Sequence, residues 1–281
     1  MILAIASGKG GTGKTSVATN LAAVTAENNR VSLLDCDTEQ PNAHLFFDME
    51  AASAEEVSMP IPKLIPEKCD GCGICGDACQ FSAIVNIGKL VITNPGLCHG
   101  CSACWELCPR DALRPVERTI GRIREKRIGK LRIVVGELTV GEISGNRIIA
   151  SAKDKIDPDE LTIIDSAPGT SCPVVEALTG TDYVLLVAEP TPFGIANFRS
   201  VAKLAMNLDL PVGVVINRSD LGDGSGIHEF AREEGLEILG EIPNDLRVAR
   251  AYSEGRLYSK EIEEYRDFYS RLAGKFVGVG S

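Results

Sequence analysis

A glycine-rich octapeptide near the start of the chain constrains its fold more than any other feature. Its residues are Gly8-Lys9-Gly10-Gly11-Thr12-Gly13-Lys14-Thr15. They fit the pattern G-x4-G-K-[ST], with an apolar run at residues 2–6 before them and a helix-like stretch at 14–28 after them. A loop of this kind lets consecutive backbone N–H groups surround phosphate oxygens, and the helix N-terminus adds positive potential. We therefore predict a phosphate-binding loop, with a plain glycine turn as the alternative.

The residues of this loop have separate expected roles at a nucleotide. Lys14 is expected to reach the β- and γ-phosphates of ATP, and the Thr15 hydroxyl is expected to ligate Mg²⁺. The predicted cofactor-binding residues of the loop are Gly8, Gly10, Gly11, Thr12, Gly13, Lys14 and Thr15. The predicted cofactors are ATP or ADP, together with Mg²⁺.

Near-continuous apolar runs alternate with helix-like stretches along most of the chain. Strand-like runs cover residues 31–35, 161–165, 183–188, 212–217 and 236–242, and helix-like stretches cover 197–208 and 226–234. Such strands are typical of a parallel sheet that helices cover on both faces. With 281 residues, 44% of them hydrophobic, the chain is long enough for one large domain and a small insertion. We predict an α/β fold with a mostly parallel sheet.

Eight of the ten cysteines lie within forty residues and form an internal repeat. The two runs, residues 69–79 and 98–108, share the spacing C-x2-C-x2-C-x3-C and are offset by 29 residues. A repeat in so short a segment predicts a small pseudo-symmetric module, and in a reducing compartment the crowding indicates metal rather than disulfides. Prolines mark both ends of the segment. We expect an inserted domain at residues 60–115 and a discontinuous domain made of 1–59 and 116–281.

Charge and hydropathy exclude several classes of protein. The formal net charge is −10 with three histidines, which argues against nucleic acid as a partner, because such binding needs a basic footprint. The sequence contains no stretch of eighteen apolar residues, so it predicts no membrane-spanning helix. The first residues run from Met1 directly into an apolar strand and lack the features of a signal peptide. We expect a mature chain that begins at Met1 and a cytoplasmic location.

Residues 114–132 are strongly basic within this acidic chain. Alternation around Ile120, Ile123, Ile128, Leu131 and Ile133 predicts a β-hairpin there. One interpretation is a solvated, exposed ribbon. The other is a docking surface for an acidic redox partner, favoured by the contrast with the rest of the chain.

The second lysine of the glycine loop, Lys9, resembles the deviant Walker A motif. That motif marks the P-loop NTPase family that contains MinD, ParA, Mrp-type proteins and the nitrogenase iron protein. The resemblance covers nearly all of the chain outside the cysteine segment. It implies that Lys9 reaches across a dimer interface and stabilises transition-state charge at the partner's nucleotide, as an arginine finger does elsewhere. ATP hydrolysis would then need a homodimer, or a heterodimer with a related ATPase.

Further motifs resemble this family residue by residue. In Asp35-Cys36-Asp37, Asp37 matches the aspartate that orients the attacking water or holds Mg²⁺ through water. In Asp165-Ser-Ala-Pro-Gly169, Asp165 matches the Walker B aspartate, which suits Mg²⁺ as an oxygen ligand. The resemblance thus implies Lys9, Lys14, Asp37 and Asp165 as catalytic residues. It also implies that Asn217 and Arg218 contact adenine and that residues 243–245 form the purine-side loop.

Each cysteine run has the spacing of bacterial ferredoxins, in which the fourth cysteine of a run ligates the other cluster. This resemblance implies two [4Fe–4S] clusters in a small α+β ferredoxin module. The first cluster would be held by Cys69, Cys72, Cys75 and Cys108. The second would be held by Cys98, Cys101, Cys104 and Cys79. Pro109 follows the second run as the motif expects, whereas Gln80 occupies the corresponding place after the first. Zinc is the competing metal, because its four-cysteine sites also use C-x2-C pairs.

Two cysteines lie outside the runs. Cys36 is expected to be a small buried core residue. Cys172 follows Asp165 by seven residues, the offset of a bridging-cluster cysteine in the nitrogenase iron protein. A labile or transferred cluster at the two-fold axis of a dimer and a structural helix-start cysteine are the two interpretations of Cys172.

Two functions of different classes follow. The first is an ATP-gated dimer that couples ATP to electron transfer, or to assembly or transfer of a metal cluster, with a redox or metal-cluster client protein. The alternative is a MinD- or ParA-like positioning or regulatory switch in which the clusters are structural or sensory. The tail at 262–281 alternates in charge and ends in Gly-Val-Gly-Ser, so we expect a surface helix without stable membrane anchoring. An amidoligase related to cobyrinate diamide synthases ranks last, because no glutaminase-like domain follows.

Overall fold

The computed structural model describes residues 1–277, and a nine-stranded sheet organises most of them. The sheet order is β11-β10-β9-β1-β8-β2-β7-β6-β3. Its first six strands are β11 (Glu237–Ile242), β10 (Val212–Asn217), β9 (Tyr183–Ala188), β1 (Ile2–Ala6), β8 (Leu161–Ser166) and β2 (Val31–Cys36). All six pair in parallel. The apolar runs of the sequence therefore form the parallel sheet that they predict.

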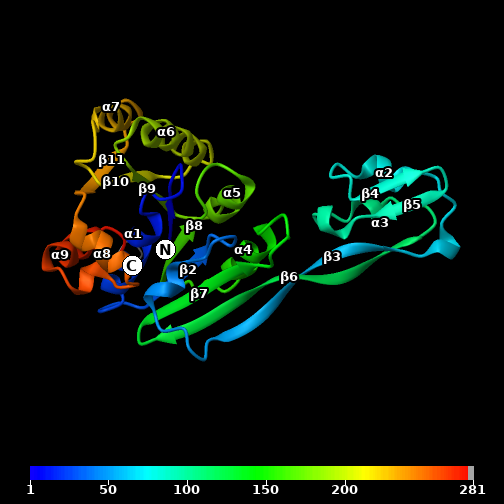
Figure 1. The fold of residues 1–281 in the computed structure, drawn as a ribbon, viewed down its shortest axis with the longest axis horizontal. Helices are drawn as coiled ribbons and strands as arrows, with labels where there is room; N and C mark the ends of the chain where they lie inside the picture. Colours follow the sequence, from blue (N-terminus) through cyan, green and yellow to red (C-terminus); the bar gives the residue numbers. More distant parts are fainter. Residues whose placement is uncertain (278–281) are drawn as a thin grey trace.

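The other three strands turn one edge of the sheet into an antiparallel ribbon. β7 (Leu131–Leu138) is parallel to β2, whereas β6 (Leu113–Ile128) and β3 (Ser53–Leu64) are antiparallel to their neighbours. β6 and β7 meet at a turn around residues 129–130, which confirms the predicted basic hairpin. β3 and β6 run on together past the body of the protein (Figure 1).

Helices cover both faces of the sheet, and each face has its own core. α1 (Lys14–Thr25), α8 (Leu246–Ser253) and α9 (Glu263–Ala273) pack with Leu3 and Ile5 on one face. On the other face, α4 (Asn146–Lys153), α5 (Cys172–Leu178), α6 (Pro192–Asn207) and α7 (Ser225–Glu234) pack with Ala4 and Ala6 (Figure 1). Because alternate residues of each central strand point to opposite faces, both sets must be apolar.

Two helices differ from their predicted bounds for local reasons. α6 begins five residues earlier than expected, because the Thr191 side chain accepts a hydrogen bond from Gly194 N–H and Pro192 occupies the first helical position. α1 ends three residues earlier than expected, at Thr25. Ala26 still packs against the core, and residues 27–29 after it carry no apolar side chain.

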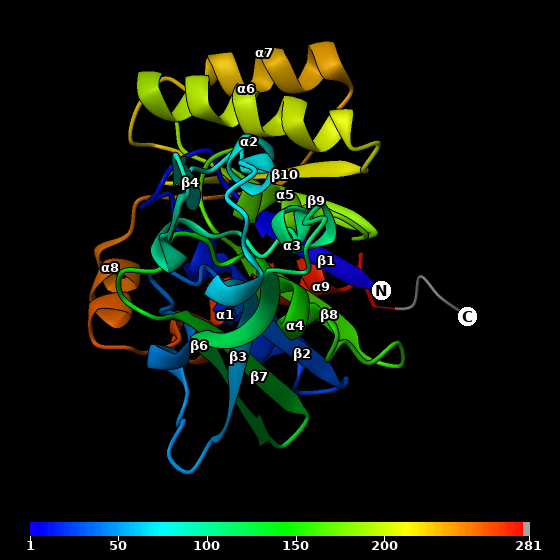
Figure 2. The ribbon, with the colours of Figure 1, turned by 90° about the vertical axis from the view of Figure 1, so that its right-hand side faces the viewer.

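At the far end of the ribbon, the residues between β3 and β6 form a small lobe together with the tips of these two strands, here called the cysteine lobe. It holds α2 (Ile74–Ala78), α3 (Ala103–Glu106) and the hairpin of β4 (Ile84–Ile87) and β5 (Leu90–Thr93). Figure 2 looks at this lobe end on. The backbone follows the 29-residue repeat. α2 and α3 occupy equivalent positions 29 residues apart. The strand pair Ile84↔Thr93 is equivalent to Leu113↔Leu64, since Leu113 lies 29 residues after Ile84 and Leu64 lies 29 residues before Thr93. The lobe is thus pseudo-symmetric, as the repeat predicts.

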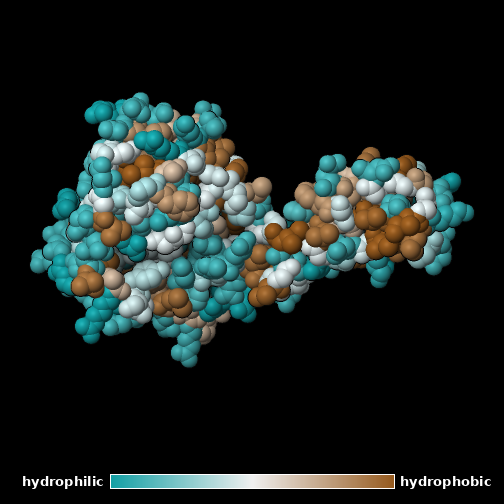
Figure 3. All heavy atoms as spheres, turned by 45° about the horizontal axis from the view of Figure 1, so that its top comes forward, coloured by the Kyte–Doolittle hydropathy of each residue, from teal (hydrophilic) through white to brown (hydrophobic). Residues whose placement is uncertain are grey.

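The cysteine lobe exposes an unusual share of apolar side chains. Eight of the sixteen exposed large apolar residues in the described part of the chain belong to it: Ile74, Phe81, Val85, Ile87, Leu90, Ile92, Leu97 and Leu107. Figure 3 shows apolar surface gathered over this lobe. The lobe therefore buries little apolar surface of its own.

The C-terminal helix packs as predicted. α9 buries Tyr265, Tyr269 and Leu272 in the core that it shares with α1. The final Gly-Val-Gly-Ser lies outside the described residues. Within residues 1–277, no helix has both the length and the apolar character that crossing a membrane requires.

Candidate functional site

The glycine loop connects β1 to α1, and α1 begins at Lys14. Gly13, which precedes the helix, has a φ of 92°, a left-handed conformation that favours glycine. A Cβ at Gly13 would lie 2.2 Å from Asn217 Nδ2, and one at Gly8 would lie 2.2 Å from the Asn197 carbonyl oxygen. The neighbouring elements therefore approach the loop so closely that glycine is required at both positions.

Lys14 and Asp165 form a buried ion pair at the centre of the site. Lys14 Nζ lies 2.5 Å from Asp165 Oδ1, at the end of β8. Burial alone favours the neutral amine, but the Asp165 carboxylate outweighs it, so the pKa of Lys14 is raised. The other oxygen, Asp165 Oδ2, is buried and has no hydrogen-bond partner among residues 1–277. An unpartnered carboxylate oxygen beside a phosphate-binding loop fits Mg²⁺, a cation that prefers oxygen ligands.

Asp35 organises the loop after β2, a role that sequence reasoning missed. It lies opposite Asp165 in the pairing of β2 with β8. Its carboxylate accepts backbone N–H bonds from Asp37, Asn42 and Ala43, at 3.1, 2.9 and 2.8 Å. Burial and then the charge of Asp165 raise the pKa of Asp35 to about 7. Because a strand-end aspartate commonly serves a turn, nothing in the sequence alone distinguishes this role.

The two predicted strand-end motifs meet across a hollow of about 590 Å³. One wall comes from the loop after β2 and the other from the loop after β8. The lining residues are Asp37, Thr38, Glu39, Gln40, Ala167, Pro168, Ser171 and Pro173. Burial raises the pKa of Asp37. The structure therefore brings Asp37 and Asp165 to one end of the sheet, beside the glycine loop.

Lys9 pairs with a different carboxylate from the one that Lys14 contacts. Its Nζ lies 3.1 Å from Glu189 Oε1, and Arg218 Nη1 lies 3.0 Å from the other oxygen of the same carboxylate. Glu189 is almost fully buried at the end of β9, and Lys9 Nζ also lies 6.0 Å from the centre of the Phe193 ring. Glu189 was not predicted, because a lone glutamate after an apolar strand carries no sequence signal.

A second hollow, of about 710 Å³, opens beside the glycine loop. Its lining includes Asn217, Arg218 and residues 243–245, all predicted near adenine. It also includes Val248, Ala249 and Tyr252 of α8, which were not predicted. Asn217 Nδ2 donates to the Thr12 carbonyl at 2.7 Å, so this amide also fixes the loop. The α8 residues are recognisable only once the fold places that helix beside the loop.

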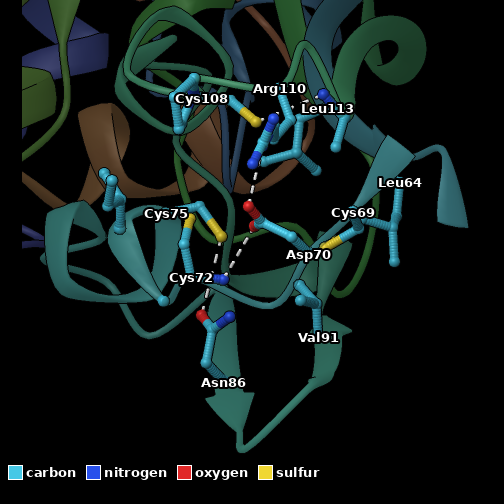
Figure 4. A pocket seen from close by; sticks show the side chains of 14 residues that line it. Leu64, Cys69, Asp70, Cys72, Cys75, Asn86, Val91, Cys108, Arg110 and Leu113 are labelled. Carbon is cyan, nitrogen blue, oxygen red and sulfur yellow. Dashed lines mark hydrogen bonds and ion pairs between the residues drawn. The ribbon is translucent and has the colours of Figure 1, made fainter. Parts of the chain in front are cut away.

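The eight clustered cysteines divide between two hollows in the cysteine lobe. Cavity one, of about 330 Å³, is lined by Cys69, Cys72, Cys75 and Cys108 (Figure 4). Cavity two, of about 320 Å³, is lined by Cys79, Cys98, Cys101 and Cys104. Each cavity thus takes three cysteines from one run and one from the other. Within residues 1–277, no three His, Cys, Asp or Glu side chains converge closely enough to hold a single metal ion.

Backbone N–H groups point at several of these sulfurs. Ala83 N–H donates to Cys79 Sγ at 3.2 Å, and Ala112 N–H donates to Cys108 Sγ at 3.3 Å. These two bonds occupy equivalent places in the 29-residue repeat. Such N–H···S bonds stabilise thiolates and tune the potential of sulfur-ligated metal centres. The cavity surroundings therefore fit iron–sulfur ligation.

The two cavities are edged by different side chains at equivalent repeat positions. Cavity one is edged by the ion pair Asp70–Arg110, with Arg110 Nε 2.8 Å from Asp70 Oδ2 (Figure 4). Shifting both positions by 29 residues gives His99 and Phe81, whose rings stack 3.7 Å apart beside cavity two. The pseudo-symmetry of the backbone is thus broken in the side chains.

The remaining predicted sites lie elsewhere. Cys172 is exposed at the first residue of α5, apart from both cavities. Cys36 is fully buried, as expected, and burial raises the pKa of its thiol. Ion pairs occupy six side chains of the basic segment: Arg118, Arg122, Arg124, Lys126, Arg127 and Arg132. This pairing leaves little free positive charge there for an acidic partner.

Comparisons with known proteins agree with this site. The CobQ/CobB/MinD/ParA nucleotide binding domain family matches residues 3–258. An uncharacterized protein of Methanocaldococcus jannaschii is 41% identical over 278 residues, covering 97% of this chain and 96% of that protein. An iron-sulfur cluster carrier protein of the same organism is 24% identical over 297 residues, covering 98% of this chain and 85% of that protein.

Among solved structures, the fold is similar to that of the septum site-determining protein MinD of Pyrococcus horikoshii OT3, complexed with Mg-ADP. The TM-score is 0.61 at 20% identity, and the likeness covers 100% of this chain and 97% of that chain. At this identity the likeness concerns the fold alone. The family match spans the glycine loop and both strand-end aspartates, and it covers most of the chain. The chain therefore belongs to the CobQ/CobB/MinD/ParA family of P-loop nucleotide-binding proteins.

Proposed function

We propose that this protein is a dimeric ATPase that carries two [4Fe–4S] clusters and couples ATP to electron transfer, or to assembly or transfer of a metal cluster to a client protein. One observation carries the proposal: eight cysteines line two separate cavities, four each, in a chain that also holds a complete phosphate-binding loop. The partner subunit would be a second copy or a related ATPase.

At the nucleotide site, different residues of this chain bind the phosphates, ligate Mg²⁺ and orient the attacking water. Backbone N–H groups of residues 8–15 and the raised-pKa Lys14 hold the phosphates. Asp165 Oδ2, which is buried and unpartnered within residues 1–277, and the Thr15 hydroxyl would ligate Mg²⁺. Asp37 orients a water that attacks the γ-phosphorus, and the bond to ADP breaks. Lys9 acts at the partner's nucleotide, which requires it to leave Glu189 when the dimer forms.

In the cysteine lobe, which we propose as a domain at residues 60–115, each cavity would hold one cluster through its four thiolates. Bound clusters supply one-electron chemistry. Zinc is the less suitable metal, because four sulfurs must then converge to about 2.3 Å from one ion, whereas in residues 1–277 no three His, Cys, Asp or Glu side chains converge closely enough to hold a single ion. The N–H groups of Ala83 and Ala112 favour the thiolate form of Cys79 and Cys108. A relative described as an iron-sulfur cluster carrier protein adds support.

Cys172 has a separate proposed role. It is exposed at the start of α5. Its two chain neighbours, Ser171 and Pro173, line the hollow beside Asp37. Two copies brought together by a dimer would form a site for a labile or transferred cluster. A structural role at the helix start remains the alternative for this residue.

A second candidate function is a positioning or regulatory switch in which the clusters are structural or sensory. The fold likeness to MinD favours it. The first candidate and a switch with structural clusters differ in whether the oxidation state of the clusters changes ATP turnover, whereas a sensory cluster would change it without passing electrons or a cluster to a client protein. In a redox or cluster-handling protein the two sites are coupled, whereas a structural cluster leaves the ATPase rate unchanged.

The deciding experiment measures ATP turnover by anaerobically purified protein with clusters oxidised and then reduced by dithionite. Iron analysis and EPR on the same samples count the clusters, and Cys36→Ala serves as a cysteine control outside the cavities. A clear difference in rate supports coupling. Equal rates with two intact clusters favour the switch. If metal analysis finds zinc in place of iron, the electron-transfer proposal is wrong.

A further inference from the structure

The two cavities differ in how they join the rest of the protein. Cys98, of cavity two, packs in the same apolar core as Ile120 of β6 and Ile148 of α4. Cys75, of cavity one, packs instead in a small core within the lobe, which it shares with Val91 and with Cys104 of cavity two. Cavity two therefore contacts the core of the ATPase body directly, whereas cavity one reaches it only through the small core that the two cavities share.

A hollow of about 600 Å³ lies where cavity two faces the body. From the lobe it is lined by Cys98 and His99. From the body it is lined by residues 142–144 of the loop between β7 and α4, and by Asn146 and Arg147 of α4. Asn146 Oδ1 is buried and has no hydrogen-bond partner. The β7–α4 loop (residues 139–145) thus faces cavity two across space that it can move into.

The same loop is packed at both of its ends against Thr38, beside the nucleotide site. Thr38 directly follows Asp37 and is buried, and its carbonyl accepts the N–H of Leu138 at 2.9 Å. A Cβ at Gly145 would lie only 1.9 Å from Thr38 Oγ1. Because close-packed groups transmit displacement rather than absorb it, any shift of Thr38 must shift Gly145 and the start of α4.

We propose that the contact between Thr38 and Gly145 relays the state of the nucleotide to cavity two and leaves cavity one largely unaffected. Both are positioning residues, since the proposal gives neither of them a contact with the nucleotide or a cluster. When Asp37 moves to its place at Mg²⁺ and the attacking water, Thr38 moves with it and displaces the β7–α4 loop. The loop then changes the surroundings of Cys98, whose Sγ accepts the Gly100 N–H at 3.4 Å. Such changes alter the potential of a sulfur-ligated cluster. The inference rests on the proposed function.

The test uses holoprotein without nucleotide, with Mg-ADP and with Mg²⁺ and a non-hydrolysable ATP analogue. Redox titration followed by EPR reports each cluster. We expect the ATP analogue to change the reduced-to-oxidised ratio of one cluster by about threefold or more at fixed potential, against little change in the other. Hydrogen exchange gives a second readout that is independent of iron. Exchange should change at residues 98–102 and stay constant at 69–73, the equivalent segment of the repeat.

Two glycines provide a matched pair of variants. Gly145→Ala places a Cβ against Thr38, whereas Gly224→Ala is the control. Gly224 also precedes a helix, with φ of −80° against −86° for Gly145, and its Cβ would have no neighbour closer than 3.7 Å. We expect Gly145→Ala to lose the response to nucleotide at residues 98–102 and Gly224→Ala to keep it. Thr38→Ala, which removes the hydroxyl group that faces Gly145, loosens the same contact and should weaken the same response should Gly145→Ala fail to fold.

The outcomes separate this inference from the proposed function. Protein that binds nucleotide and never holds iron would contradict the proposed function, while hydrogen exchange would still test the relay. Two intact clusters with equal responses to nucleotide, or with none, would overturn the relay alone. Retention of the full response in Gly145→Ala would overturn it as well.

Discussion

The nucleotide site and the cysteine lobe are built in opposite ways. At the nucleotide site, the charged groups are largely paired: Lys14 lies against one oxygen of Asp165, and the Asp35 carboxylate accepts three backbone N–H bonds. In the cysteine lobe, eight cysteines line two cavities, and many large apolar side chains lie exposed rather than packed in a core. The difference indicates that the sheet is stabilised by its own packing, whereas the lobe has little core of its own.

The strongest test of this contrast is removal of the metal. We expect iron chelation to abolish protection from hydrogen exchange in residues 65–112 and to leave β1 and β8 protected. The physical reason is that a lobe of this size has too small a hydrophobic core to fold unaided, so it needs an additional cross-link such as a bound metal. Protein treated with the same chelator already saturated with iron is the control. Equal protection of the lobe before and after chelation would contradict the comparison.

The next effect concerns Lys14. Lys14→Gln should lower ATP turnover by about a hundredfold or more, because one charge that stabilises the transferred phosphoryl group is lost. The EPR signals of both clusters should be unchanged, since the lobe does not use this residue. Turnover and EPR measured on one preparation check both statements. Loss of the clusters together with turnover would show that the two regions do not fold independently.

Lys9 tests whether the nucleotide site is complete within one subunit. Lys9→Ala should lower turnover by about a hundredfold, because the trans cation is missing. Mixing Lys9→Ala with Lys14→Gln should restore part of the activity. In the mixed dimer, one site keeps its own Lys14 and receives Lys9 from the other subunit. Absence of rescue, with mixed dimers demonstrated by a tag on one variant, would place Lys9 in its own subunit's site.

The smallest effect distinguishes the two cavities. Phe81→Ala removes half of the stack with His99 and should speed iron release to a chelator by about three- to tenfold, because water then reaches cavity two. Asp70→Asn breaks an exposed ion pair beside cavity one, and such pairs contribute only about 0–1 kcal/mol. Iron release measured by absorbance should therefore stay close to that of the unaltered protein. A larger effect of Asp70→Asn would reverse the comparison.

The sequence was informative wherever function requires a local pattern. The glycine loop, the apolar strands and the cysteine repeat each predict an element that the structure contains. The sequence was silent wherever a role depends on the tertiary fold. Glu189 and Tyr252 reach the nucleotide site only because β9 and α8 end beside the loop. The boundaries of the cysteine lobe stay a prediction, because the ribbon passes without a break from sheet to lobe.

The ribbon of β3 and β6 also bears on how such a protein could arise. Pro60 and Glu117 are direct partners in the ladder, so the chain enters and leaves the cysteine lobe at neighbouring points. Joining these positions by a tight turn would leave a plain hairpin at the edge of an otherwise complete sheet. An ancestral ATPase with such a hairpin could gain a redox module at its tip, or later lose it, without altering a single residue around the nucleotide.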